Sequence, residues 1–110
     1  MTTENKATFV NCTPHTIYLN DGRAFEPCGS VARVAQLISE FDEDGIAVQS
    51  FGEVMGLPEP RPNTYYIVSA LVLSRAQAEG RNDVVAPATG HKACIRDEKK
   101  FIVSVPGFLR

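Results

Sequence analysis

Four residues between positions 15 and 83 carry side chains suited to binding an anion or moving a proton. His15 follows Pro14 between two apolar runs, and its imidazole titrates near neutral pH, so it suits a base, a metal ligand or a hydrogen-bond donor. Ser69 stands where an apolar run changes to a helical pattern. The backbone amides at such a helix N-terminus donate hydrogen bonds and can bind a phosphate or a carboxylate. Beyond that helix, the Arg81 guanidinium could contact a phosphate while Asp83 orients it or binds a ribose hydroxyl.

Each of these residues also has a purely structural interpretation. His15 could be a turn residue whose ring bonds a neighbouring carbonyl, and Ser69 could be no more than a helix cap. Asn11 and Thr13 can fold back on the backbone as Asx and hydroxyl turns. Arg81 and Asp83 could be a local ion pair that fixes a loop. The residues alone leave these alternatives open.

Signatures of common catalytic and metal sites are missing from the sequence. It contains no G-x-S-x-G, H-E-x-x-H, Walker A or G-x-G-x-x-G motif. A two-histidine phosphoesterase needs Thr or Ser two positions after each histidine, and neither His15 nor His91 has one. Cys12 and His15 lack the second pair of ligands that defines a zinc motif, and Cys28 and Cys94 stand apart from them. We therefore expect no metal and no cofactor, and we favour binding over catalysis.

The composition is typical of one globular domain. Of 110 residues, 44% are hydrophobic and 22% charged, which excludes a disordered chain. The net charge of −2 provides no overall positive field to attract bulk DNA or RNA. No apolar run approaches the roughly 20 residues of a membrane span, and residues 1–6 lack the features of a signal peptide. We expect a single domain over 1–110 with reduced cysteines in the cytoplasm.

Short strands are the elements that must position these residues. The pair Asp21-Gly22 predicts a tight hairpin turn that links strands around Ile17 and Phe25. Further runs of β-branched and aromatic residues predict strands at 7–11, 31–38, 46–51, 65–68, 93–96 and 101–105, with an acidic turn at 42–45. Three prolines between 58 and 62 indicate a stiff surface connection, or alternatively a recognition motif.

One helix is predicted over residues 70–79. Ser69 is a favoured N-cap, Gly80 is a favoured residue just past the C-terminus, and Leu71, Val72 and Ala76 give a modest apolar face. The predicted fold class is therefore α+β, with a mostly antiparallel sheet of about six to eight short strands and one principal helix packed against it.

An ordered set of motifs runs along nearly the whole chain, at 10–15, 52–58, 66–69, 81–87 and 95–97. The first of these resembles the V-N-x-T-P-H opening of a family of small proteins from phages, prophages and bacteria, and the others extend the resemblance. By position, it implies that the residues of a shared ligand site are Asn11, Thr13, His15, Ser69, Arg81 and Asp83. The predicted helix spans about 15 Å, so Ser69 and Arg81 can share a site only if the chain runs back along the helix or a neighbouring subunit contributes.

The resemblance to phage proteins implies a function by analogy. Phages carry compact non-enzymatic sponges that sequester the nucleotide messengers of bacterial immunity, such as cyclic ADP-ribose isomers and cyclic oligonucleotides. We expect a protein of this kind, binding a phosphate-bearing nucleotide as a homo-oligomer, most simply a dimer. Alternatives are a nucleotide-processing enzyme that uses His15 and Asp83, or a protein-binding inhibitor or assembly accessory that uses the proline-rich segment and the strand at 101–105.

Overall fold

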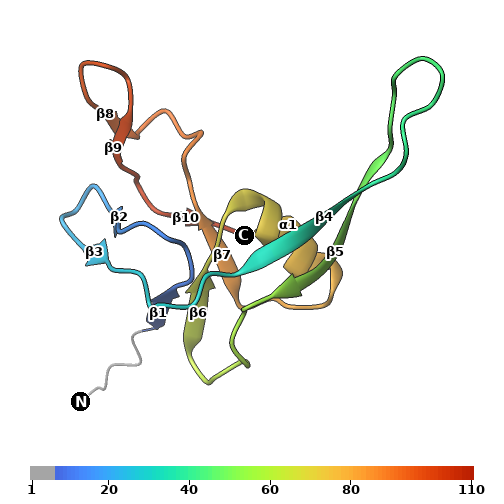
Figure 1. The fold of residues 1–110 in the computed structure, drawn as a ribbon. Helices are drawn as coiled ribbons and strands as arrows, with labels where there is room; N and C mark the ends of the chain where they lie inside the picture. The colour runs from blue at the N-terminus through green and yellow to red at the C-terminus, as the bar shows by residue number, and fades with distance from the viewer. Residues whose placement is uncertain (1–6) are drawn as a thin grey trace.

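Ten short strands and one helix form within residues 7–110, the part of the chain that the computed structural model describes (Figure 1). In chain order they are β1 (Thr8–Asn11), β2 (Ile17–Tyr18), β3 (Ala24–Phe25), β4 (Arg33–Ile38), β5 (Gln49–Met55), β6 (Thr64–Ile67), α1 (Ala70–Ala78), β7 (Val84–Pro87), β8 (Ile95–Arg96), β9 (Ile102–Ser104) and β10 (Phe108–Leu109). The α+β class and the single helix are confirmed. The strands number ten rather than six to eight, and they are divided among several small sheets.

The central sheet is mixed rather than antiparallel. Its strand order is β1-β6-β7-β10, in which β6 pairs in parallel with both β1 and β7, while β10 is antiparallel to β7. Tyr66 and Ile67 in β6 are fully buried, as the sequence predicts for a central strand. The run at 84–87 is a strand that was not predicted, because a short apolar run without alternation gives no periodic signal. Its parallel pairing is possible because α1 connects it to β6.

The predicted hairpins form around the turns that local chemistry indicates. Ile17 pairs with Phe25, and Gly22 has a φ of +99°, so the Asp21-Gly22 turn is confirmed. The acidic turn at 42–45 connects β4 to β5, although the returning strand starts at Gln49 rather than at 46. The last hairpin pairs β8 with β9.

Helix α1 covers the central sheet and the base of the β4–β5 hairpin. The Ser69 side chain accepts a hydrogen bond from the Val72 amide, and Gly80 has a φ of +93°, so both predicted ends are confirmed. Val72 and Ala76 are buried in a core that also contains Tyr66, whereas the predicted core residue Leu71 is 44% exposed. Among the described residues, no helix is long and apolar enough to cross a membrane.

The molecule is elongated for its length. Its radius of gyration is 16.7 Å and its longest extent is 66 Å, whereas a compact domain of this size has a radius of gyration of about 13 Å. The β4–β5 hairpin projects from the core (Figure 1), and we call residues 34–55 the arm. A second hairpin, formed by β8 and β9, projects in another direction (Figure 1).

Gly56, at the end of the arm, provides a test of this geometry. Its φ is +82°, and an added Cβ would lie 2.6 Å from the Val31 carbonyl oxygen. We predict that Gly56→Ala lowers the free energy of unfolding by more than about 2 kcal/mol, because the clash adds to the roughly 1–2 kcal/mol cost of a left-handed alanine. Gly45→Ala is the control, since Gly45 has a φ of +80° but open space around it. Equal losses for the two variants in urea unfolding would contradict the predicted clash.

Candidate functional site

The V-N-x-T-P-H segment is held together by its own polar groups. The Asn11 side chain is 1% exposed, and its Nδ2 donates hydrogen bonds of 2.8 Å to the carbonyls of His15 and Phe25. Its Oδ1 accepts from the amide and the hydroxyl of Thr13, at 2.9 and 2.6 Å. This network ties the end of β1 to β3, so Asn11 and Thr13 position backbone in this structure. The sequence could not distinguish this Asx turn from a ligand-binding pair.

His15 takes part in this network through its carbonyl oxygen. That oxygen accepts from Asn11 and from the Thr13 hydroxyl, the latter at 3.0 Å, while the residue as a whole is exposed. The imidazole is therefore accessible to water.

Ser69 lies in a groove of about 320 Å³ at the N-terminus of α1. Thr13 and Arg33 line the same groove, together with apolar side chains of Val31, Val34 and Val72. Ser69 Oγ is occupied by the Val72 amide, at 3.3 Å. The groove combines a helix N-terminus with one arginine, but most of its lining is apolar.

Arg81 and Asp83 form a bidentate ion pair just past α1. Arg81 Nε and Nη2 each lie 2.9 Å from a carboxylate oxygen of Asp83, and Nη2 also donates to the Pro58 carbonyl. The guanidinium carbon lies 5.8 Å from the centre of the buried Tyr66 ring. The two side chains are 22% and 16% exposed. The Arg81 hydrogen bonds hold the pKa of Asp83 below its usual range, and the pair in turn raises the pKa of Arg81.

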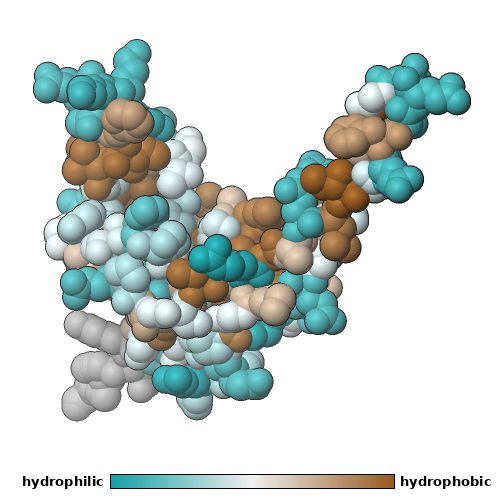
Figure 2. Space-filling model, viewed as in Figure 1, coloured by the Kyte–Doolittle hydropathy of each residue, from teal (hydrophilic) through white to brown (hydrophobic). Residues whose placement is uncertain are grey.

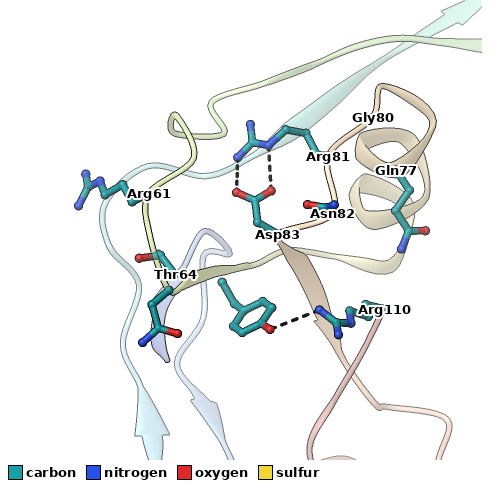
Figure 3. Close-up of a pocket in the computed structure, with 10 residues that line it drawn as sticks. Arg61, Thr64, Gln77, Gly80, Arg81, Asn82, Asp83 and Arg110 are labelled. Atoms are coloured by element: carbon teal, nitrogen blue, oxygen red, sulfur yellow. Dashed lines mark hydrogen bonds and ion pairs between the residues drawn. The ribbon is translucent and has the colours of Figure 1, made fainter. Parts of the chain in front are cut away.

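A large cavity lies beside this ion pair. It has a volume of about 790 Å³, within the usual range for ligand sites. We call it the arginine cavity. It is lined by Arg61, Asn63, Thr64, Tyr65, Gln77, Gly80, Arg81, Asn82, Asp83 and Arg110 (Figure 3). These residues come from the proline-rich segment before β6, the start of β6, the end of α1, the loop before β7 and the segment beyond β10.

Positive charge dominates the arginine cavity. The lining contains three arginines and one acidic side chain, Asp83, which leaves a surplus of two positive charges among the lining side chains. The C-terminal end of α1 contributes a partial negative charge of about half a unit, too little to cancel that surplus. Arg110 is held over the Tyr65 ring, with its guanidinium carbon 5.5 Å from the ring centre and a hydrogen bond of 3.3 Å to the hydroxyl. The arrangement suits an anionic ligand with several acceptor oxygens.

The six residues predicted as one site do not share a cavity within a single chain. Asn11, Thr13 and His15 form the network at the end of β1, Thr13 and Ser69 line the groove at the start of α1, and Arg81 and Asp83 line the arginine cavity. Helix α1 separates Ser69 from Arg81, as its length requires. A role of these residues in binding a ligand stays a prediction.

Only Arg81 and Asp83 among the residues of the arginine cavity were predicted as site residues; Arg61, Tyr65 and Arg110 are among those that were missed. Arg61 lies in the proline-rich segment, and Arg110 is distant from it in sequence, so no local pattern joins them. A metal site is not indicated, because residues 7–110 contain no group of three or more His, Cys, Asp or Glu that could hold an ion.

The Arg81–Asp83 pair predicts a pH-dependent stability. Because folding lowers the pKa of Asp83 below its usual 3.8, the pair stabilises the fold above that pH and loses its contribution as pH falls further. Asp83→Asn should lower the free energy of unfolding by roughly 1–3 kcal/mol at pH 7, with the difference from wild type shrinking below about pH 4. Urea unfolding between pH 7 and 3 measures both. Asp21→Asn, in an exposed pair with Arg23, is the control and should have little effect.

A second prediction concerns the neighbouring thiols of Cys12 and Cys28, whose sulfur atoms lie 4.0 Å apart. Burial, with a smaller contribution from Cys28, raises the pKa of Cys12 to about 12, while Cys28 is exposed. Because the thiolate is the nucleophile, an alkylating reagent at pH 8 should modify Cys28 and leave Cys12 unmodified until the protein is denatured. Peptide mapping by mass spectrometry checks this. Equal labelling of both cysteines in the native protein would contradict the described burial.

Comparisons of the chain with protein-family models, with curated proteins and with solved structures find no match. A function for this chain must therefore be inferred from the geometry of the arginine cavity and from the motif resemblance, which stays a prediction.

Proposed function

We propose that this protein binds and sequesters a phosphate-bearing nucleotide messenger of bacterial antiphage immunity, and that the arginine cavity is its binding site. A cyclic ADP-ribose isomer or a cyclic oligonucleotide is the expected ligand class. The observation that carries the proposal is that Arg61, Arg81 and Arg110 all line one cavity of about 790 Å³. The resemblance to phage proteins supplies the biological setting.

The chemistry of the lining fits a nucleotide in two respects. Guanidinium groups bind phosphate oxygens through charge-assisted, often bidentate hydrogen bonds. Arg81 Nε and Nη2 are already bonded within the protein, so Arg61 and Arg110 are the principal candidates for phosphate contacts. The amide side chains of Gln77 and Asn82 carry both donors and acceptors, which suit ribose hydroxyls and base edges.

Sequestration fits this site better than turnover. An enzyme that used His15 and Asp83 together would need both near one reacting group. Asp83 lines the arginine cavity, whereas His15 belongs to the exposed network at the end of β1. The Asp83 carboxylate is bound by Arg81 on both oxygens and has a lowered pKa, so it is a weak base. A binding protein needs neither group to move a proton.

The direct experiment incubates the purified protein with a panel of cyclic ADP-ribose isomers and cyclic di- and trinucleotides. Isothermal titration calorimetry measures binding, and heat denaturation followed by mass spectrometry identifies what is released. Recovery of an intact ligand supports sequestration. Release of an altered nucleotide would replace sequestration with catalysis, and the absence of binding across the panel would contradict the proposal.

Substitutions then test the location of the site. Arg61→Ala and Arg110→Ala should each weaken binding by about tenfold or more, because one charge-assisted hydrogen bond contributes roughly 1.5–3 kcal/mol. The matched control is Arg33→Ala, which removes an arginine from the groove at the start of α1. Weaker binding in the control alone would place the ligand at the helix N-terminus and would contradict the arginine cavity. Unchanged melting temperatures for all three variants exclude a loss of fold.

A further inference from the structure

The arm exposes large apolar side chains along its length. Brown side chains follow it up to a hydrophilic tip in Figure 2. Its large hydrophobic residues that are more than half exposed are Leu37 (55% exposed), Ile38 (58%), Phe41 (70%), Ile46 (61%), Val48 (71%) and Met55 (66%). Contiguous exposed apolar surface of this kind marks an interaction site in a soluble protein.

Beyond its base, where Val34 and Val54 pack on the core, neither face of the arm is covered by the described part of its own chain. Leu37 and Ile38 are consecutive in β4 and therefore point to opposite faces of the hairpin, yet both are more than half exposed. A two-stranded hairpin in water is marginally stable at best without packing on a further layer. A partner that contacts both faces would supply that layer.

The charge of the arm indicates what such a partner must present. Residues 34–55 contain five acidic residues and no lysine or arginine. Four of the five, Glu40, Asp42, Glu43 and Asp44, are at or beside the turn that forms the tip. The partner surface should therefore combine exposed apolar side chains with a surplus of positive charge.

The β8–β9 hairpin of the same protein has these properties. Residues 91–104, which we call the basic hairpin, contain four lysines and arginines against two acidic residues. Their exposed apolar side chains are Ile95 (50%), Phe101 (68%), Ile102 (37%) and Val103 (51%). A largely apolar cavity of about 520 Å³ lies at its base, lined by Ile17, Tyr18, Pro87 and residues 102–105. Figure 2 shows a brown patch below a hydrophilic tip here too.

We propose that the arm of one copy of this chain binds the basic hairpin of a second copy. The two hairpins project from opposite sides of the core (Figure 1), so one chain does not bring them together. Apolar contacts along the arm remove both sets of exposed side chains from water, and the acidic tip faces the lysines and arginines. Because the two surfaces differ, the contact closes either as a reciprocal dimer or as a ring. This inference is independent of the nucleotide proposal.

Reversing the charge of each surface by substitution provides the test. Sedimentation equilibrium gives a mass that does not depend on molecular shape. For wild-type protein at about 20 µM this mass should be two or more times the monomer mass of 12.0 kDa. The first variant, Glu40→Lys/Glu43→Lys/Asp44→Lys, changes the net charge of the arm from −5 to +1, and the second, Lys92→Glu/Lys99→Glu, changes that of the basic hairpin from +2 to −2. Each should weaken association at least tenfold, because like charges then meet at the contact. An equimolar mixture of the two should assemble again, since each arm then meets a hairpin of opposite charge. Asp42 is left unchanged because its carboxylate accepts hydrogen bonds from the backbone amides of Asp44 and Ile46 in the turn.

Glu26→Lys is the control, an exposed reversal outside both surfaces, and it should leave the mass unchanged. Phe41→Ser/Val48→Ser should give monomers that melt no lower than the charge-reversed monomers, because both side chains are exposed in the single chain. A wild-type mass of 12.0 kDa at all concentrations up to about 100 µM would overturn the proposal. So would an assembly that both charge-reversal variants leave intact, or an equimolar mixture of those two variants that fails to associate.

Discussion

The burial of β6 between two parallel neighbours is the constraint on which the rest of the fold depends. Tyr66, Ile67 and Val68 are fully buried, and the strand pairs in parallel with β1 and with β7. A parallel pair cannot be closed by a tight turn, so each pairing needs a long connection. Helix α1 is the connection to β7, and residues 12–63 are the connection from β1. The arm and the β2–β3 hairpin therefore both lie within the connection between β1 and β6 and outside the central sheet.

The same strand direction places the two candidate sites at opposite edges of the sheet. The carboxyl end of β6 leads into Ser69 and the groove at the N-terminus of α1, the edge where open α/β sheets commonly bind ligands. The arginine cavity lies at the other edge, beside the start of β6 and the loop before β7. The groove at the first edge presents Arg33 and about half a unit of positive charge from the helix, whereas the second edge presents three arginines, one carboxylate and about half a unit of negative charge from the helix. The net charges are similar, and the arginine cavity is distinguished by its three guanidinium groups, which offer an anionic ligand more hydrogen-bond donors than the single Arg33 does.

The sequence predicted those features that depend on neighbouring residues. The Asp21-Gly22 turn, the Ser69 cap and the Gly80 stop are decided by backbone preferences within a few positions, and all three are confirmed. Strand pairing between β1 and β6 joins segments more than fifty residues apart, and no local pattern encodes it. The residues of the arginine cavity show the same dependence on distance in the sequence. Arg81 and Asp83 are two residues apart and were singled out, while Arg61 and Arg110 reach the same cavity only through the tertiary fold.

A net charge of −2 conceals a strong separation of charge along the chain. The arm is purely acidic from residue 34 to 55, the basic hairpin has a positive surplus, and three arginines line one cavity. The arm extends along a molecule 66 Å long, and salt screens exposed charges beyond about 8 Å at physiological ionic strength, so the acidic tip does not cancel the field in its own chain's cavity. The arm, the basic hairpin and the arginine cavity therefore each interact electrostatically only with groups at short range. Long-range steering of a nucleotide is weak in such a protein, and its affinity must come from contacts within the cavity.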